Sequence, residues 1–432
     1  MAEILPIRAW RYNPQLAAEI EALTAPLFDV VSEKQRQALY RNSYNSIHLT
    51  VPQGTPQQAA QLLQSWKENN ILIQDKLPGI YVYYQYFTLP GNPKPFCRKG
   101  FICHVRVYDW NEGIILRHEN TIPGAVNDRI ALLESTAFHS SPTHGLYEDP
   151  NFTLEPLMDE AMTQPLYETE DYQGVRDVLA VIHDARAIKM FMQVLRDKTL
   201  VLADGHHRYE ASIAVKQKCR AASPHHTGKE GYNYHLMYLT NTKANDLCIL
   251  PTHRLIKDLP GLNEQAVMKK LEEYFAIRPL EEPDTIPEII AGKPWAFGLI
   301  FPENAYKIRL KPEALTRITW PFPKEILELD LTVLHYFILE KALGIPGKTQ
   351  RSSPYVAYDR NFSDCLLKVM QGKAQLAIIT NQITIEQVMQ VCRSGYTMPQ
   401  KSTYFYPKVI SGFVFSSIRQ SEFAVPPYAP FP

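Results

Sequence analysis

The sequence has no excess of charge of either sign. Across 432 residues, 45 Lys and Arg balance 45 Asp and Glu, so the formal net charge is zero. Proteins that hold duplex nucleic acid nonspecifically usually carry a basic surplus, so composition disfavours a nucleic-acid partner. The chain also lacks the run of about 18 apolar residues that a transmembrane helix needs. Its first residues have no basic start and no continuous apolar stretch, so we expect neither a signal peptide nor a membrane segment.

Cysteine is scarce and scattered. The six cysteines form no C-x-x-C pair. A zinc site would need Cys or His ligands at paired spacings, which this distribution does not offer. A few isolated cysteines in a long chain indicate reduced, buried thiols, and we therefore predict a cytoplasmic protein.

The composition is otherwise that of a globular protein. The hydrophobic fraction is 45% and the charged fraction 21%, close to the usual averages of about 45–50% and about 25%. The 33 prolines favour many short elements over long bundle helices. Helical and strand patterns alternate, which predicts a mixed α/β (α+β) fold. Because the chain becomes less aromatic and more helical near residue 260, we predict an N-terminal region over 1–260 and a C-terminal α/β lobe over 261–432.

Local patterns predict individual elements. Ser32 is placed to cap a helix that runs to about Tyr40. The aromatic stretch 80–87 is expected to pair with 100–107 through a Pro-Gly-Asn-Pro turn. Further expectations are strands at 47–51 and 409–415, a strand pair formed by 232–239 and 247–250, and a helix over 331–343 capped by Asp330.

The most informative segment is Leu200-Val201-Leu202-Ala203-Asp204-Gly205-His206-His207-Arg208-Tyr209-Glu210. It predicts a buried strand, a tight turn at Gly205 and the start of a helix. Cations in a first helical turn are disfavoured by roughly 0.3–1 kcal/mol each, yet three potential cations stand there. A bound anion would reverse that penalty, and glycine would let the backbone approach it closely. The alternative is a structural cap, with Asp204 bonded to the helix amides and the histidines exposed.

The run D-G-H-H-R at 204–208 resembles the motif of the ParB/sulfiredoxin superfamily, in particular its free-serine kinases. The resemblance covers about 175–256 and implies a ParB/sulfiredoxin-like core with an N-terminal elaboration. It also implies a nucleotide phosphate donor, ATP or ADP, with Mg²⁺. Sulfiredoxins need a cysteine where this chain has His206, so that activity is not expected. ParB partition proteins add a basic helix-turn-helix domain, which we do not find.

Nearly the whole chain also resembles a bacterial and archaeal family known as domain of unknown function 1015. This family resemblance implies no particular activity. The resembling stretches are 25–32, 118–121, 127–129, 203–209, 250–254 and 398–408.

By the kinase resemblance, three residues are predicted to be catalytic. Asp204 would orient the phosphates or hold magnesium, His206 would contact the phosphates, and Glu119 would accept the hydroxyl proton. Asp184 is the alternative base, since the resemblance places the base closer upstream than Glu119 lies. The sequence is equally compatible with Glu119 as an ordinary loop carboxylate that has no catalytic role.

The remaining predicted site residues would bind phosphate or nucleotide. Within the motif these are Gly205, His207 and Arg208. A second set stands further along the chain, at His253, Arg254, Lys401, Ser402, Tyr404 and Lys408. Lysines and hydroxyls suit phosphate contacts, and a tyrosine such as Tyr404 or Tyr406 could stack on a base. The alternative for 399–408 is a polar loop that enters a strand. We expect the C-terminal lobe to close on the motif through Lys401 or Lys408.

Together these observations predict a nucleotide-dependent small-molecule phosphotransferase, and the kinase resemblance suggests free serine or a similar hydroxyl compound as the acceptor. Its partners would be a small-molecule substrate and a nucleotide. One alternative is a non-catalytic nucleotide-binding or regulatory protein. A second is a ParB-like DNA-associated protein, which the zero net charge disfavours. The acceptor, the donor base and the oligomeric state do not follow from the sequence.

Overall fold

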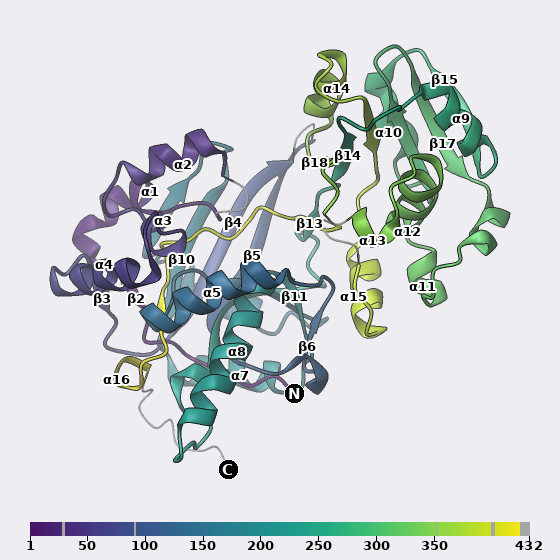
Figure 1. Cartoon of the computed structure of the whole chain (residues 1–432). Coiled ribbons are helices and arrows are strands. Elements are labelled where there is room, and N and C mark those ends of the chain that lie inside the picture. The colour runs from purple at the N-terminus through teal and green to yellow at the C-terminus, as the bar shows by residue number, and fades with distance from the viewer. Residues whose placement is uncertain (28–30, 90–91, 351, 399–401, 424–432) are drawn as a thin grey trace. The chain divides into compact units, whose positions relative to one another are not determined.

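The computed structural model describes residues 1–27, 31–89, 92–350, 352–398 and 402–423 (Figure 1). Its contacts group the chain into two compact units. Unit 1 contains Met1–Arg117, Thr121–Leu247 and the described residues of Pro407–Pro432. Unit 2 contains His118–Asn120 and the described residues of Cys248–Tyr406. The predicted boundary near residue 260 thus lies inside unit 2, and the chain after Tyr406 returns to unit 1.

Unit 1 is built on a nine-stranded mixed sheet. The strand order is β6-β11-β8-β12-β5-β4-β10-β9, and β1 pairs with β5 outside this path. Two of the pairings, β11 with β6 and β12 with β8, are parallel, and the others are antiparallel. The strands are β1 (Ile4–Leu5), β4 (Ile80–Leu89), β5 (Asn92–Arg106), β6 (Ile115–Arg117), β8 (Thr143–Tyr147), β9 (Tyr167–Glu170), β10 (Arg176–Ile182), β11 (Leu200–Asp204) and β12 (Tyr234–Asn241).

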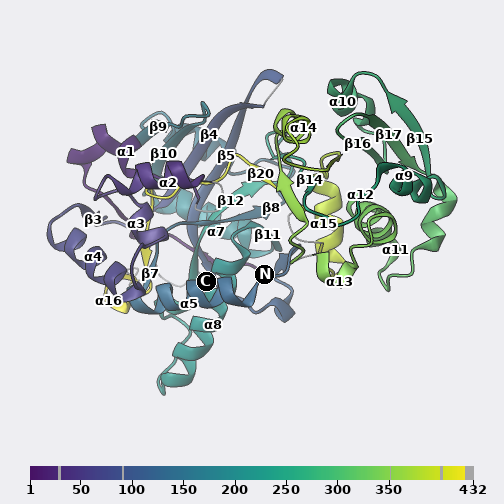
Figure 2. The same cartoon turned by 45° about the horizontal axis from the view of Figure 1, so that its top comes forward.

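Helices and two small sheets complete unit 1, and α5 and α8 lie side by side in both views (Figures 1 and 2). The small sheets are β2 (Trp10–Tyr12) with β3 (Leu72–Gln74), and β7 (Phe138–His139) with β21 (Ser416–Ser417). The helices are η1 (Pro14–Glu19), α1 (Ile20–Leu23), α2 (Glu33–Tyr40), α3 (Ile47–Thr50), α4 (Pro56–Glu68), η2 (Trp110–Glu112), α5 (Pro123–Thr136), α6 (Glu155–Ala161), α7 (Ala185–Arg196), α8 (His206–Ala222), η3 (Gly231–Asn233) and α16 (Gln420–Phe423).

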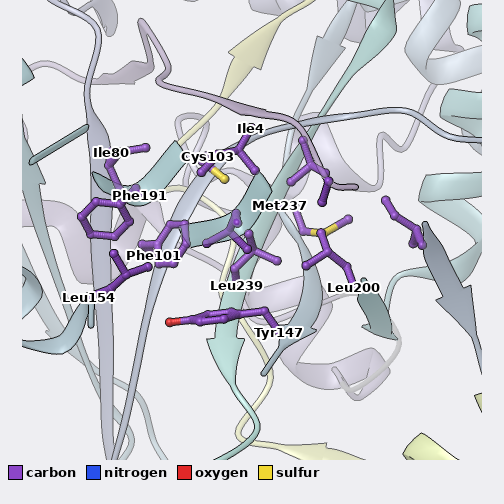
Figure 3. Close-up of a cluster of buried hydrophobic side chains, with 14 of the residues drawn as sticks. Ile4, Ile80, Phe101, Cys103, Tyr147, Leu154, Phe191, Leu200, Met237 and Leu239 are labelled. Carbon is purple, nitrogen blue, oxygen red and sulfur yellow. The ribbon is translucent and has the colours of Figure 1, made fainter. Parts of the chain in front are cut away.

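Each face of the large sheet buries a separate apolar cluster. On one face, side chains of β4, β5, β11 and β12 pack against α6 and α7; Phe101 and Phe191 meet there with ring centroids 4.7 Å apart (Figure 3). On the other face, Tyr81, Tyr83 and Tyr238 pack with α4 and with a C-terminal segment that includes Ile410. The alternation of side chains along β4 produces this division, because successive residues point to opposite faces.

Unit 2 contains a six-stranded antiparallel sheet in the order β15-β17-β16-β19-β14-β18 and a two-stranded sheet of β13 and β20. One face packs on η6 and α9, and the other on α10 and α14. The strands are β13 (Cys248–Ile249), β14 (His253–Ile256), β15 (Phe275–Leu280), β16 (Ala296–Ile300), β17 (Ala305–Leu310), β18 (Val356–Asp359), β19 (Leu376–Ile379) and β20 (Phe405–Tyr406). The helices are α9 (Glu264–Glu272), η4 (Pro283–Thr285), α10 (Ile286–Ile290), η5 (Pro312–Arg317), α11 (Lys324–Leu327), α12 (Asp330–Val333), the π-helix η6 (Leu334–Ala342), α13 (Gly347–Gln350), α14 (Phe362–Met370) and α15 (Ile385–Arg393).

The mixed α/β class and several predicted elements are confirmed. Ser32 caps α2 through a capping box with Gln35. The stretches 80–87 and 100–107 lie in the paired strands β4 and β5; the Pro90-Gly91 part of their turn is outside the described residues.

Two predictions near the chain ends are wrong. Residues 47–50 form helix α3, because Asn45 Oδ1 accepts a hydrogen bond from the Ile47 amide and starts a helical turn. Residues 409–415 form no strand; they pack as irregular chain on the unit 1 sheet.

Two further predictions fail because distant segments supply the partners. Strand β12 inserts between β5 and β8, while β13 pairs with β20, so 232–239 and 247–250 do not pair with each other. Asp330 is the first residue of α12 and does not cap it; its carboxylate accepts a hydrogen bond from the Trp295 amide at 2.8 Å. The helix predicted over 331–343 continues from α12 as the π-helix η6.

Candidate functional site

The D-G-H-H-R motif joins the end of β11 to the start of α8, which confirms the predicted strand, turn and helix. Gly205 makes the turn with φ of +90°, a conformation that side chains disfavour. A Cβ atom there would lie 2.5 Å from Thr143 Cγ2 and 2.9 Å from Arg208 Nη2. Glycine is therefore required both by the backbone conformation and by the close approach of β8.

A β-bulge next to the motif sets the position of Asp204. Leu202 pairs with Gly145, but Asp204 pairs with His144, so β11 has one extra residue at this point. Leu202 belongs to the apolar cluster on the α7 side. The His144 ring instead lies 5.2 Å from the ring of Tyr238, in the cluster on the opposite face. In a regular strand, Asp204 would point to the same apolar face as Leu202. The bulge turns the Asp204 carboxylate away from that face.

Two cations converge on the Asp204 carboxylate. Oδ2 lies 3.2 Å from Arg208 Nη2, and Oδ1 pairs with the Lys408 amine. Only 17% of the Asp204 side chain is exposed, with 13% for Arg208 and 10% for Lys408, so solvent screens these pairs weakly. Burial by itself raises the pKa of Asp204, but the charges of Lys408 and Arg208 outweigh it and hold the pKa well below its usual value. Two cations therefore face this one carboxylate.

The first turn of α8 adds hydrogen-bond donors beside these charges. No side chain caps this helix, and His206 in its first turn is buried. Arg208 is fixed by two hydrogen bonds that Nη1 donates, at 2.8 Å each, to Ser141 Oγ and to the Pro142 carbonyl. Uncapped amides of a first turn, with the partial positive charge of the helix, attract anions. The geometry thus suits an oxyanion such as phosphate.

His207 has a different partner from the other motif residues. The Ile122 amide donates a hydrogen bond of 3.0 Å to His207 Nε2, and Ile122 immediately precedes α5. A nitrogen that accepts a hydrogen bond carries no proton, so His207 is neutral in this arrangement. This contact ties the start of α8 to the start of α5. It assigns His207 a positioning role in addition to the phosphate contact predicted from the sequence.

A buried polar network fixes the backbone that carries Lys408. Gln85 Nε2 donates hydrogen bonds to the Lys408 carbonyl at 3.0 Å and to Asp177 Oδ1 at 2.8 Å. Arg98 donates to Gln85 Oε1 and to the Pro407 carbonyl. Gln85, Arg98 and Asp177 are at most 1% exposed. The sheet thereby holds Lys408 where its amine reaches Asp204.

Sequence reasoning missed this network. Its signal in the sequence is that Gln85 and Arg98 interrupt two strands that are otherwise mostly apolar and aromatic where they are buried. The register pairs these two residues directly with each other. Polar residues inside a predicted hairpin are common on exposed faces, and only the sheet order shows that both faces here are covered.

The other predicted site residues belong to unit 2. Glu119 is half-buried and forms a parallel bridge with Met398. His253 and Arg254 lie in β14 and are buried, as are Ser402 and Tyr404. Burial lowers the pKa of His253 to about 4, so its ring is neutral at pH 7. Lys401 lies outside the described residues.

The predicted site residues therefore divide between the two units. The unit 1 set is Asp204, Gly205, His206, His207, Arg208 and Lys408. The unit 2 set is Glu119, His253, Arg254, Ser402 and Tyr404. Because Lys408 belongs to unit 1, its contact with Asp204 is internal to that unit and does not depend on the C-terminal lobe. Closure of the lobe on the motif stays a prediction.

The described residues do not fit the predicted magnesium site at Asp204. Among them, no group of three or more His, Cys, Asp or Glu side chains is arranged to hold a metal ion. Both Asp204 oxygens already face cations, Lys408 on one side and Arg208 on the other. A divalent cation at this carboxylate would meet repulsion from both, so we derive no step through a metal.

Within the part of the chain that is described, no helix is both long and apolar enough to cross a membrane.

The chain belongs to the family described as "protein of unknown function (DUF1015)", whose model matches residues 4–332. No curated protein matches the sequence.

Three solved structures show a distant likeness to the chain, each at 12% identity and each covering 72% of it. A free serine kinase in complex with AMP matches over 90% of its own chain, with a TM-score of 0.37. A conserved hypothetical protein from Pyrococcus furiosus matches over 94%, with a TM-score of 0.34. SbnI with a C-terminal truncation, from Staphylococcus aureus, matches over 86%, with a TM-score of 0.35.

Proposed function

We propose that this protein is a nucleotide-dependent phosphotransferase that acts on a small hydroxyl compound, such as free serine, with ATP or ADP as the donor. The observation that carries the proposal is the convergence of Arg208 and Lys408 on Asp204 beside the uncapped first turn of α8. Phosphoryl transfer depends mainly on positioning and on neutralising the charge of the transferred group. The two cations and the first-turn amides of α8 supply both requirements.

The motif residues take separate roles in this proposal. Arg208 and Lys408 neutralise phosphate oxygens, and the amides of the first turn of α8 hydrogen-bond to them. Asp204 keeps the two cations apart and oriented when no phosphate is bound. Gly205 allows the ligand and β8 to approach the backbone closely. The D-G-H-H-R run, which resembles that of the ParB/sulfiredoxin superfamily, supports the same assignment.

Glu119 is our proposed acceptor of the hydroxyl proton, and Asp184 is the alternative. Asp184 is exposed and caps α7, where its Oδ1 accepts a hydrogen bond of 2.8 Å from the Ala187 amide. An aspartate that caps a helix has a sufficient structural role, which favours Glu119. Glu119→Gln should then retain nucleotide affinity and lose turnover, while Asp184→Asn should retain both. Turnover that survives Glu119→Gln would reject this base.

A non-catalytic nucleotide-binding protein is the second candidate. One observation favours it. The two carboxylates of unit 1 that we considered for a catalytic role already have partners: Asp204 faces two cations, and Asp184 caps a helix. A binder would show nucleotide affinity but no transfer to any of a broad panel of hydroxyl acceptors. Turnover with any of these acceptors would exclude it.

Calorimetric titration with ADP and ATP tests the phosphate site itself. Arg208→Ala removes a charge-assisted contact of roughly 1.5–3 kcal/mol, so affinity should fall about tenfold or more. Arg186→Ala, at an exposed arginine of α7, is the matched control and should bind like the wild type. Unchanged nucleotide affinity in a folded Arg208→Ala protein would overturn the proposal. Circular dichroism of each variant would establish that it is folded.

A further inference from the structure

Unit 2 contains a pocket that is lined by polar side chains and by one charged residue. Its space, about 340 Å³ including the part open to solvent, lies between Thr252 before β14, the start of α12, the loop after β19 and the first turn of α15. Hydroxyl and amide side chains form most of the wall, with Thr380, Gln387 and Ser402 among them. Among the described residues that line the pocket, Asp330 alone is charged, and it is negative.

The carboxylate of Asp330 has no cationic partner. Its Oδ1 accepts the 2.8 Å hydrogen bond from the Trp295 amide. No Lys, Arg or His nitrogen of the described residues lies within 4 Å of its oxygens. Burial raises the pKa of Asp330, and hydrogen bonds from the Trp295 amide and the Asn381 side chain oppose this only in part. The pocket therefore presents a carboxylate whose charge is stabilised by neutral donors only.

A buried hydroxyl in the same pocket has no partner in the protein. Thr252 is 4% exposed. Its carbonyl accepts hydrogen bonds from Arg254 and from the Thr380 hydroxyl, but no described residue forms a hydrogen bond with the Thr252 hydroxyl itself. Buried hydroxyls nearly always have a partner, so this one indicates that a ligand atom or a water molecule occupies the pocket.

Two neighbouring groups carry positive charge, and neither neutralises Asp330. Arg254 bonds to the Thr252 carbonyl, but it does not line the pocket and is not among the groups that shift the pKa of Asp330. The N-terminus of α15 is closed by a capping box between Thr384 and Gln387, which occupies two of the amides that attract anions. The pocket lining thus offers no charge to an anion and one carboxylate to a cation.

We propose that this pocket binds the ammonium group of a small primary amine, with Asp330 as the counter-ion. An ammonium group has three N–H donors and no acceptor, so carboxylate, hydroxyl and amide oxygens are suitable partners. Asp330 accepts a charge-assisted hydrogen bond, and the Thr252 hydroxyl accepts a second one. A metal ion fits less well, because no three His, Cys, Asp or Glu side chains of the described chain are arranged to hold one. The pocket is separate from the D-G-H-H-R motif, and the proposal does not rest on the proposed function.

A purely structural role is the alternative for Asp330. Its carboxylate holds the Trp295 amide and lies in the first turn of α12, where a negative charge is favoured. In that case Asp330→Asn would lower stability, and the wild type would bind no amine. Amine binding, and not stability, therefore distinguishes the two roles.

The probe is ethanolamine, titrated at pH 7 into the full chain and followed by ligand-observed NMR. It carries an ammonium group but no carboxylate or phosphate, so the cations of the motif do not attract it. Ethylene glycol, which has no charge, is the control ligand. We expect ethanolamine to bind about tenfold or more tightly than ethylene glycol, because only the ammonium gains a charge-assisted hydrogen bond to Asp330.

Two pairs of variants locate the bound amine. Asp330→Asn keeps the shape of the side chain and an acceptor for the Trp295 amide, but it removes the charge, so affinity should fall about tenfold or more. Asp284→Asn, at an exposed aspartate of unit 2, is the matched control and should bind like the wild type. Thr252→Val removes the hydroxyl and should weaken binding about threefold or more, whereas Thr252→Ser keeps the hydroxyl and should retain the affinity.

Three results would overturn the proposal. The first is that ethanolamine does not bind to the wild type, and the second is that ethylene glycol binds as tightly. The third is that a folded Asp330→Asn protein binds ethanolamine as tightly as Asp284→Asn does. If Asp330→Asn does not fold, equal affinities of Thr252→Val and Thr252→Ser would overturn the proposal instead. No nucleotide enters this experiment, so its outcome is separate from that of the proposed function.

Discussion

Arg98 in unit 1 and Arg254 in unit 2 are both fully buried, yet their surroundings differ. Arg98 holds the Pro407 carbonyl and Gln85, and its charge acts on two carboxylates, the buried Asp177 and the half-buried Asp246. Burial raises the pKa of Asp177 to about 7 and that of Asp246 to about 6, and Arg98 counteracts both shifts. Arg254 is surrounded instead by a carbonyl, a neutral histidine and a tyrosine.

This difference separates an arginine whose charge acts on nearby carboxylates from one whose charge meets only neutral groups. The network around Arg98 holds Lys408 against Asp204, although Nε and Nη1 of Arg98 and Oδ2 of Asp177 are buried without hydrogen-bond partners. The surroundings of Arg254 leave its charge unbalanced. A buried polar atom without a partner costs stability in both regions, but only around Arg98 do carboxylates offset the charge. The two regions should consequently respond to pH in opposite directions.

The largest effect is expected at the histidine beside Arg254. The pKa of His335 falls from about 6.5 in the unfolded chain to about 3 in the fold. The unfolded state therefore binds more protons between these values, and the contribution to stability is full above pH 6.5 and lost as pH falls. Relative to His335→Gln, which keeps an acceptor for Arg254, the wild type should lose about 1.4 kcal/mol per pH unit, or about 5 kcal/mol over the whole window.

Urea denaturation between pH 7 and pH 5 measures this slope. The control is His225→Gln, at an exposed loop position, which should differ from the wild type by the same amount at every pH. A constant difference between wild type and His335→Gln would show that His335 does not titrate between the two states. It would also remove the neutral environment that the comparison attributes to Arg254.

A somewhat smaller effect of opposite sign is expected in the Arg98 network. Because the pKa of Asp177 rises from about 3.9 in the unfolded chain to about 7 in the fold, the folded state binds the extra proton. Stability from this group is full below pH 3.9 and lost as pH rises to 7. Relative to Asp177→Asn, the wild type should lose about 4 kcal/mol across that window. Asp197→Asn, at an exposed position, should follow the wild type at every pH. A gain of wild-type stability on raising the pH would contradict this account.

The same comparison explains what the sequence can predict. The motif is local: β11, Gly205 and α8 follow from a buried apolar run, a glycine and a helical pattern in consecutive residues. The partner of Asp204 is not local, because Lys408 stands 204 residues away. The sequence singles out Lys408 by its chemistry, but not the carboxylate that it meets. Only the return of the chain to unit 1 after Tyr406 brings them together.

Long-range pairing accounts for the failed fold predictions as well. A hairpin such as β4 and β5 is predictable because turn residues connect two adjacent patterns. Strand β12 inserts between β5 and β8, and β13 finds its partner in β20, more than 150 residues further on. Hydrophobic alternation shows which side chains of a strand face the core, but it does not show which strands pair with it. For the same reason the polar pair Gln85 and Arg98 could not be recognised as buried.

The smallest effect, and the sharpest test of unit 1, is expected from Asp204→Asn. The substitution removes the negative charge that both Arg208 and Lys408 face. Breaking such a pair should cost about 3 kcal/mol in phosphate-free buffer. Asp184→Asn is the control, because asparagine caps a helix about as well as aspartate and should change stability by less than about 0.5 kcal/mol.

Added phosphate then decides what the two cations do. If they form an anion site, inorganic phosphate can take the place of the missing carboxylate, so it should stabilise Asp204→Asn more than it stabilises the wild type. If phosphate stabilises Asp204→Asn no more than Asp184→Asn, then Arg208 and Lys408 serve only to neutralise Asp204. In that event the motif is a structural ion-pair cluster and the phosphate site must lie elsewhere.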